Sequence, residues 1–117
     1  MKIAILVREE TMKTCTGKGC FNAFFNRIDA FENYGDSIEL VGFTHAGGDI
    51  AHKIEKMKDN GVEIVHLSTC LRAKAPDYEA LAETLSKDFK VVGYTHGSEI
   101  GKTRETVNLE KKQEEQL

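Results

Sequence analysis

The sequence lacks both an excess of positive charge and any long apolar run. Among its 117 residues, 16 are Lys or Arg and 19 are Asp or Glu, which gives a formal net charge of −3. The basic residues are scattered, whereas a nucleic-acid-binding surface would gather them in a patch. No apolar stretch approaches the roughly 20 residues that a membrane-spanning helix needs, and the chain starts directly with a predicted strand, too early for a signal peptide. We therefore expect a cytoplasmic protein that binds neither nucleic acid nor membrane.

The sequence also has too few cysteines for a disulfide framework, and it lacks several catalytic motifs. Its three cysteines, Cys15, Cys20 and Cys70, form an odd number, whereas disulfides need pairs. In a reducing compartment such cysteines are better explained as free thiols, metal ligands or redox centres. There is no C-x-x-C motif, no cysteine followed by arginine at the spacing of a phosphatase loop, no G-x-G-x-x-G and no G-x-x-x-x-G-K-[ST]. The corresponding redox, phosphatase, dinucleotide and P-loop functions are not supported.

What is present is a regular alternation of strands and helices. Apolar runs predict strands at Lys2–Val7, Ile38–Phe43, Glu63–Leu67 and Lys90–Tyr94, and helical spacing predicts helices at Gly19–Tyr34, at Asp49–Asn60 and from Pro76-Asp77 through Leu85. Arg8–Lys18 and Ser68–Ala75 are predicted loops, and residues 101–117 a polar helix or tail. The alternation predicts a single three-layer α/β domain in residues 1–100. Its sheet should be four-stranded, parallel and flavodoxin- or Rossmann-like, with the first and third strands central.

Potential metal ligands lie in or just after the predicted strands. They are Cys15 and Cys20 after the first strand, His45 after the second, His66 and Cys70 at the end of the third, and His96 after the fourth. The carboxyl ends of parallel strands meet at one edge of a sheet, and ligands bind there. Cysteine and histidine are the usual ligands of structural zinc. The sequence therefore predicts a zinc site at this edge, built from Cys15, Cys20, Cys70 and His96, with His45 or His66 as substitutes.

Several of these residues also have plainer interpretations. The Cys15–Cys20 pair precedes a predicted helix, whose N-terminus would favour thiolate, but a buried cysteine can equally be a small apolar residue. His66 lies inside a strand, where a hydrogen-bonded core histidine is commoner than a ligand. Asp49 is most simply the N-cap of the following helix, and the preceding glycines, Gly47 and Gly48, are candidates for an anion-binding nest.

Taken together, these motifs resemble the CGGC-domain family. The resemblance consists of the C-x4-C pair, the T-x-x-G-G turn of residues 44–48, the H-L-x-T-C motif of residues 66–70 and the T-H-G motif of residues 95–97. It runs from Lys2 to about Gly97 and implies a Cys/His-rich α/β domain for which zinc binding has been proposed. The family's Cys-Gly-Gly-Cys turn is replaced here by Ala46-Gly47-Gly48-Asp49. Ala75-Pro76-Asp77 also stands where the family tends to carry another cysteine, so the implied site has fewer thiols.

Three functions remain open from the sequence. The first is a small metal-binding domain that holds zinc, or alternatively an iron–sulfur cluster in which the three cysteines would leave one position to another ligand. The second is a thiol-dependent enzyme that uses Cys70 or Cys15 beside His96 or His45. The third is a binding module that keeps the fold and has lost the metal.

Overall fold

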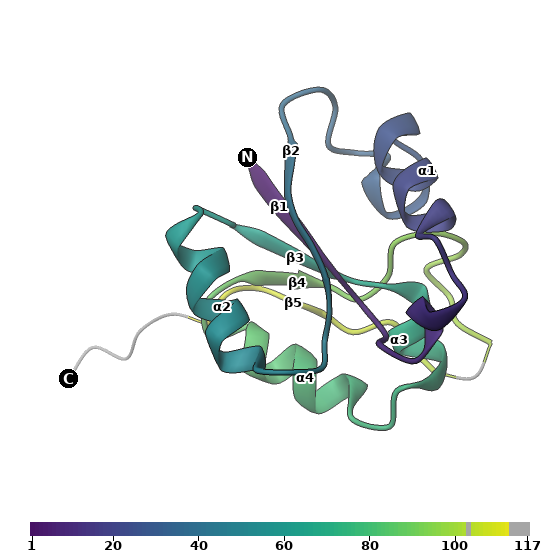
Figure 1. Ribbon diagram of the computed structural model, residues 1–117. Coiled ribbons are helices and arrows are strands. Elements are labelled where there is room, and N and C mark those ends of the chain that lie inside the picture. Colours follow the sequence, from purple (N-terminus) through teal and green to yellow (C-terminus); the bar gives the residue numbers. More distant parts are fainter. Residues whose placement is uncertain (103, 113–117) are drawn as a thin grey trace.

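A mixed sheet of five strands forms the centre of the molecule. The computed structural model describes residues 1–102 and 104–112. The strands are β1 (Lys2–Val7), β2 (Glu39–His45), β3 (Ile64–Leu67), β4 (Lys90–Val92) and β5 (Asn108–Leu109), in the spatial order β2-β1-β3-β4-β5 (Figure 1). β1 to β4 are parallel, and β5 is antiparallel to β4. The α/β class and the placement of β1 and β3 between β2 and β4 are as predicted. The prediction of a purely parallel, four-stranded sheet is wrong.

β1 is buried on both faces, which explains its unbroken apolar run. Successive side chains of a strand point to opposite faces. Ile3, Ile5 and Val7 therefore join one apolar cluster, whereas Ala4 and Leu6 join another. Each cluster needs its own cover of helices, and this requirement produces helical layers on the two sides of the sheet.

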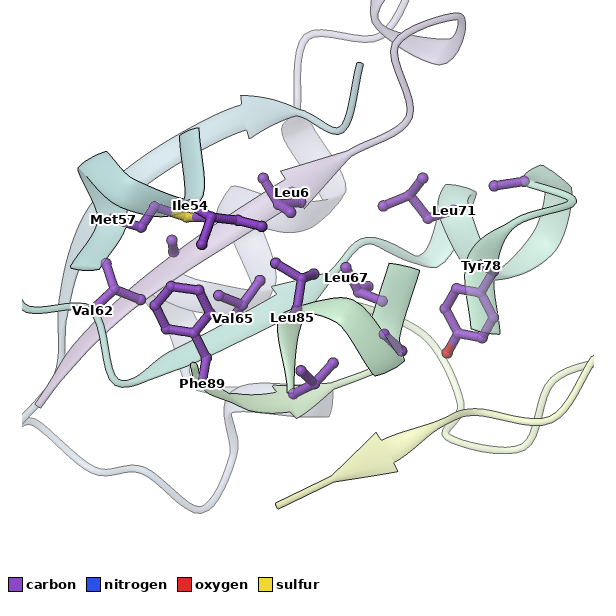
Figure 2. Close-up of a cluster of buried hydrophobic side chains, with 14 residues drawn as sticks. Leu6, Ile54, Met57, Val62, Val65, Leu67, Leu71, Tyr78, Leu85 and Phe89 are labelled. Carbon is purple, nitrogen blue, oxygen red and sulfur yellow. The ribbon is translucent and has the colours of Figure 1, made fainter. Parts of the chain in front are cut away.

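Three helices cover one face of the sheet, and α1 covers the other. The three are α2 (Ile50–Asp59), α3 (Thr69–Lys74) and α4 (Tyr78–Leu85). Figure 2 shows side chains of β1 and β3 meeting those of these helices: Leu6, Val65 and Leu67 pack with Ile54, Met57, Leu71, Tyr78 and Leu85. On the opposite face lie α1 (Lys18–Asn26) and the 3-10 helix η2 (Asp29–Phe31). A second 3-10 helix, η1 (Thr11–Lys13), follows β1.

The helix predicted at Gly19–Tyr34 is interrupted. α1 ends at Asn26, and Arg27 and Asp29 take left-handed backbone angles, with φ of 52° and 55°. The Asp29 carboxylate accepts a hydrogen bond from the Gly97 amide at 3.0 Å, so a contact distant in sequence holds this break. The apolar pattern continues through the break because Phe24, Phe31 and Tyr34 enter the same cluster.

The predicted loop at Ser68–Ala75 contains a short helix instead. Ser68 is the N-cap of α3, and its hydroxyl accepts a hydrogen bond from the Leu71 amide at 3.3 Å. Six residues are too few for a clear helical period, so the cap was the one available sequence signal. The helix places Cys70 in its first turn.

Part of the segment predicted as a polar helix or tail belongs to the sheet. The Asn108 side chain accepts a hydrogen bond from the Gly93 amide at 3.1 Å, and the Tyr78 hydroxyl bridges the Gly93 carbonyl and the Val107 amide. These bonds join β5 and its flank to Tyr78 and Gly93, which are distant in sequence, so no local pattern predicted β5. Residues 113–117 of the predicted tail lie outside the described residues. Among the residues that the structure describes, every helix is too short or too polar to traverse a bilayer.

Candidate functional site: a thiol-lined pocket

Four of the six predicted metal ligands line one cavity beyond the carboxyl ends of β1 and β3. They are Cys15, Cys20, Cys70 and His96, and the cavity has a volume of about 260 Å³. Its remaining walls are Val7, Thr11, Met12, Gly17, Gly19, Thr69 and Ala73. We call this cavity the thiol pocket. The predicted convergence of these four residues is thus present, although their role as metal ligands stays a prediction.

The three free cysteines differ in how they are held. Cys20 is buried in the first turn of α1, and its Sγ lies 3.3 Å from the Thr95 hydroxyl. Cys70 is half-buried, with its Sγ 2.8 Å from the Ser68 hydroxyl. Cys15 is exposed in the segment between η1 and α1, and its Sγ accepts a hydrogen bond from the Gly17 amide at 3.3 Å. Two thiols are therefore fixed on helices, and the third lies on irregular backbone.

Burial dominates the acidity of Cys20. Loss of solvent raises the pKa of the Cys20 thiol above its ordinary value, and the hydrogen bond to Thr95 opposes this only in part. The neighbouring Cys70 and Cys15 act on the Cys20 pKa in the same direction as burial. For Cys20, burial works against the lowering of the thiol pKa that is expected at a helix N-terminus.

His96 packs against the start of α1. A Cβ atom at Gly19 would lie 2.9 Å from His96 Cε1 and Nε2, so only glycine leaves room for the imidazole in this position. His96 Nδ1 lies 3.1 Å from the Thr95 hydroxyl. Burial lowers the pKa of His96 below its ordinary value and so favours the neutral imidazole. A neutral imidazole nitrogen can bind a metal or accept a proton.

Thr69 and Thr95 hold these groups together, and the sequence reasoning did not single them out. The Thr69 hydroxyl donates to the His96 carbonyl at 2.7 Å and accepts from the His96 amide at 3.2 Å. Fully buried Thr95 places its hydroxyl between Cys20 and His96. Both threonines belong to the motifs at residues 66–70 and 95–97, which was the available signal.

His45 lies outside the thiol pocket. Its Nδ1 accepts a hydrogen bond from the Gly47 amide at 3.0 Å and lies 3.4 Å from Glu9 Oε2. The Lys53 ammonium donates to the carbonyl oxygens of His45 and Gly47 at 2.7 and 2.9 Å. The Gly47 amide was predicted, together with the Gly48 amide, to bind an anion, but it already donates a hydrogen bond to His45 within the turn.

The turn that replaces Cys-Gly-Gly-Cys ends in a helix cap. Asp49 Oδ1 accepts a hydrogen bond from the His52 amide at 3.0 Å, which confirms Asp49 as the N-cap of α2. Neither Ala46 nor Asp49 lines the thiol pocket. This turn is a local structural element of the chain.

His66 is a core residue and does not reach the pocket. Its Nδ1 donates to the Tyr94 carbonyl at 3.0 Å, its Nε2 accepts from the Tyr34 hydroxyl at 2.8 Å, and its ring stacks on Phe31 with centroids 4.2 Å apart. Burial lowers the pKa of His66 to about 4. His66 is therefore neutral and satisfied, which is the plainer of the two interpretations given by the sequence.

The donor set of the pocket suits zinc in its chemistry, because three cysteines and one histidine form a recognised tetrahedral zinc set. The side chains are not, however, positioned to bind a metal ion together. Within residues 1–102 and 104–112, no three His, Cys, Asp or Glu side chains are grouped closely enough to hold a metal ion. A metal bound by all four residues would require at least two of them to move.

The sheet and the pocket define a small α/β protein whose cysteines gather at the carboxyl edge of parallel strands. The family model of the CGGC domain matches residues 2–96, and the chain belongs to this family. Comparison with curated proteins gave no match, and comparison with solved structures gave none either. The family resemblance inferred from the motifs is confirmed.

Proposed function

We propose that the protein binds a soft metal ion, zinc in the first place, in the thiol pocket through Cys15, Cys20, Cys70 and His96. The observation that carries the proposal is that all three cysteines of the chain line one cavity together with one of its four histidines. Soft thiolate ligands with an imidazole select zinc, Cu(I) or iron–sulfur clusters over harder ions. Family membership supports the same conclusion.

At least two ligands must move, and Cys15 is the one that is held least firmly. Cys20 and Cys70 are held by α1 and α3, whereas Cys15 is exposed and its sulfur accepts a hydrogen bond from the amide of Gly17, two residues along the chain. Closure of this segment over the cavity brings the third sulfur to the other two. Because the ligand thiols must lose their protons, and burial raises the pKa of Cys20, binding releases protons and strengthens with rising pH.

Metal analysis with a thiol titration tests the proposal. Untagged protein is loaded anaerobically with zinc, dialysed and assayed for metal, and its thiols are titrated before and after chelation. We expect one zinc per chain and thiols that react only after chelation. Cys70→Ser and His96→Gln should lower zinc retention, whereas the matched control His52→Gln, on the exposed side of α2, should leave it unchanged. Equal thiol reactivity with and without zinc, and no retained metal, would contradict the proposal.

A thiol-dependent enzyme is the second candidate, favoured by one contact. The Thr95 hydroxyl connects Cys20 to His96, and His96 shares the pocket with Cys15 and Cys70. A histidine near a thiol can accept its proton and activate it as a nucleophile. In this case the metal-free protein would contain one fast-reacting thiol, and His96→Gln would slow that thiol while His52→Gln would not. An iron–sulfur cluster would instead appear as iron and visible absorbance after anaerobic reconstitution.

A further inference from the structure

A second, basic cavity adjoins the thiol pocket along α3. It has a volume of about 380 Å³, and its lining includes Arg72, Lys102 and Arg104. Its other walls include Ser98, Ile100 and Gly101, from the segment between β4 and β5. We call it the arginine cavity. No carboxylate is among its lining residues within the described ranges, so its charge is of one sign.

Arg72 is the central group of this cavity. Its side chain belongs to a residue with only 6% of its surface exposed. Its Nη1 donates to the carbonyls of Ser98 and Glu99, each at 3.1 Å, and to the Thr106 hydroxyl. The guanidinium also lies over the Tyr94 ring, 5.7 Å from its centroid. These partners are neutral, so they satisfy hydrogen bonds without cancelling the charge.

No counter-ion for Arg72 stands in the part of the chain that the structure describes. The ion pairs found there within 4.0 Å all involve other cations, including Arg104, which pairs with Glu79. A buried charge is unfavourable unless an opposite charge compensates it. A guanidinium presents donors in a planar fork that matches carboxylate and phosphate oxygens. The missing partner is therefore best supplied by an oxyanion from outside the chain.

The two cavities share a wall. Thr69 and Ala73 line both of them and lie one helical turn apart on α3. We propose that the arginine cavity binds the oxyanion group, carboxylate or phosphate, of a small organic molecule whose uncharged part extends along α3 into the thiol pocket. This proposal does not depend on metal binding, because the arginine cavity contains none of the cysteines.

The test uses metal-free protein dialysed free of chelator, with inorganic phosphate, acetate and butyrate as probes at matched ionic strength. We follow the Nε–H resonance of Arg72 by NMR and the melting temperature. Phosphate or a carboxylate should shift this resonance and raise the melting temperature, since a ligand that binds only the folded state stabilises it. Butyrate should bind more tightly than acetate because its chain reaches the thiol pocket. Comparing the response to phosphate with the response to acetate shows whether the cavity prefers a phosphate or a carboxylate.

Two variants test the role of the basic residues, and a third serves as a control. Arg72→Gln should abolish the rise in melting temperature. This substitution also removes the hydrogen bonds that Nη1 donates to the carbonyls of Ser98 and Glu99. Lys102 is exposed, so replacing it disturbs the fold less than replacing Arg72. Lys102→Glu should weaken binding of the oxyanion at least several-fold. Lys53→Gln, at the Gly47–Gly48 turn, should leave the response unchanged. The proposal is wrong if no probe moves the Arg72 resonance, or if the response is lost in Lys53→Gln and kept in Lys102→Glu.

Discussion

Acidification should destabilise this protein through His66 more than through any surface histidine. His66 is fully buried, and burial lowers its pKa from the ordinary value of 6.5 to about 4. In the neutral form with the proton on Nδ1, its two nitrogens are satisfied by the Tyr94 carbonyl and the Tyr34 hydroxyl. Protonation would place an uncompensated charge against the ring of Phe31.

The sign and size follow from proton linkage. Because the pKa of His66 is lower in the folded state, the unfolded chain binds more protons between about pH 6.5 and pH 4. Stability is therefore full above pH 6.5 and falls as the pH is lowered through that window. One pKa unit corresponds to about 1.36 kcal/mol, so His66 alone should remove roughly 2.5 kcal/mol of unfolding free energy between pH 7 and pH 4.5.

Urea unfolding at a series of pH values measures this contribution. The comparison is with His66→Gln, whose amide can replace both hydrogen bonds but does not titrate. The variant should be less stable at pH 7, yet its free energy of unfolding should fall by about 2.5 kcal/mol less than that of the wild type on acidification. His52→Gln, on an exposed helix face, should follow the wild type. Parallel pH profiles for wild type and His66→Gln would refute the argument.

Three further substitutions test other parts of the structure. Gly19→Ala should displace the His96 imidazole by steric contact, changing its NMR shifts and lowering zinc retention, while thermal stability changes little because only the end of a side chain must move. Asp49→Ala should remove the N-cap of α2 and lower the unfolding free energy in urea by about 1 kcal/mol. Gly93→Ala should place a methyl group against the Tyr78 hydroxyl and the Val107 carbonyl, which we expect to destabilise the fold by about 1–3 kcal/mol and to increase amide exchange in β5. An unchanged melting temperature for Gly93→Ala, or unchanged His96 shifts for Gly19→Ala, would count against the packing described here.

Much of the site could be predicted because it depends on local patterns and one topological rule. Apolar runs locate β1 to β4, and the parallel arrangement brings their carboxyl ends to one edge. Cysteines that follow β1 and β3 must then lie near each other, since these strands are hydrogen-bonded neighbours. The short helix α3 and the break after α1 were missed because a helix cap and a hydrogen bond from the distant Gly97 amide to Asp29, rather than periodicity, decide them.

The sequence by itself determined the α/β class, the family and the gathering of Cys15, Cys20 and Cys70, because hydrophobic periodicity and chain order dictate these features. The sequence named His96 as the histidine of the set, with His45 or His66 as substitutes, and the tertiary structure selected among these three. His45 ends β2 at the edge of the sheet, on the far side of β1 from β3 and β4. His66 pairs in register with Ile5 and so points into the core beneath α1 and η2. His96 follows β4 and is turned toward α1 by Thr69, Thr95 and the room left at Gly19, contacts between segments that meet only when the chain is folded.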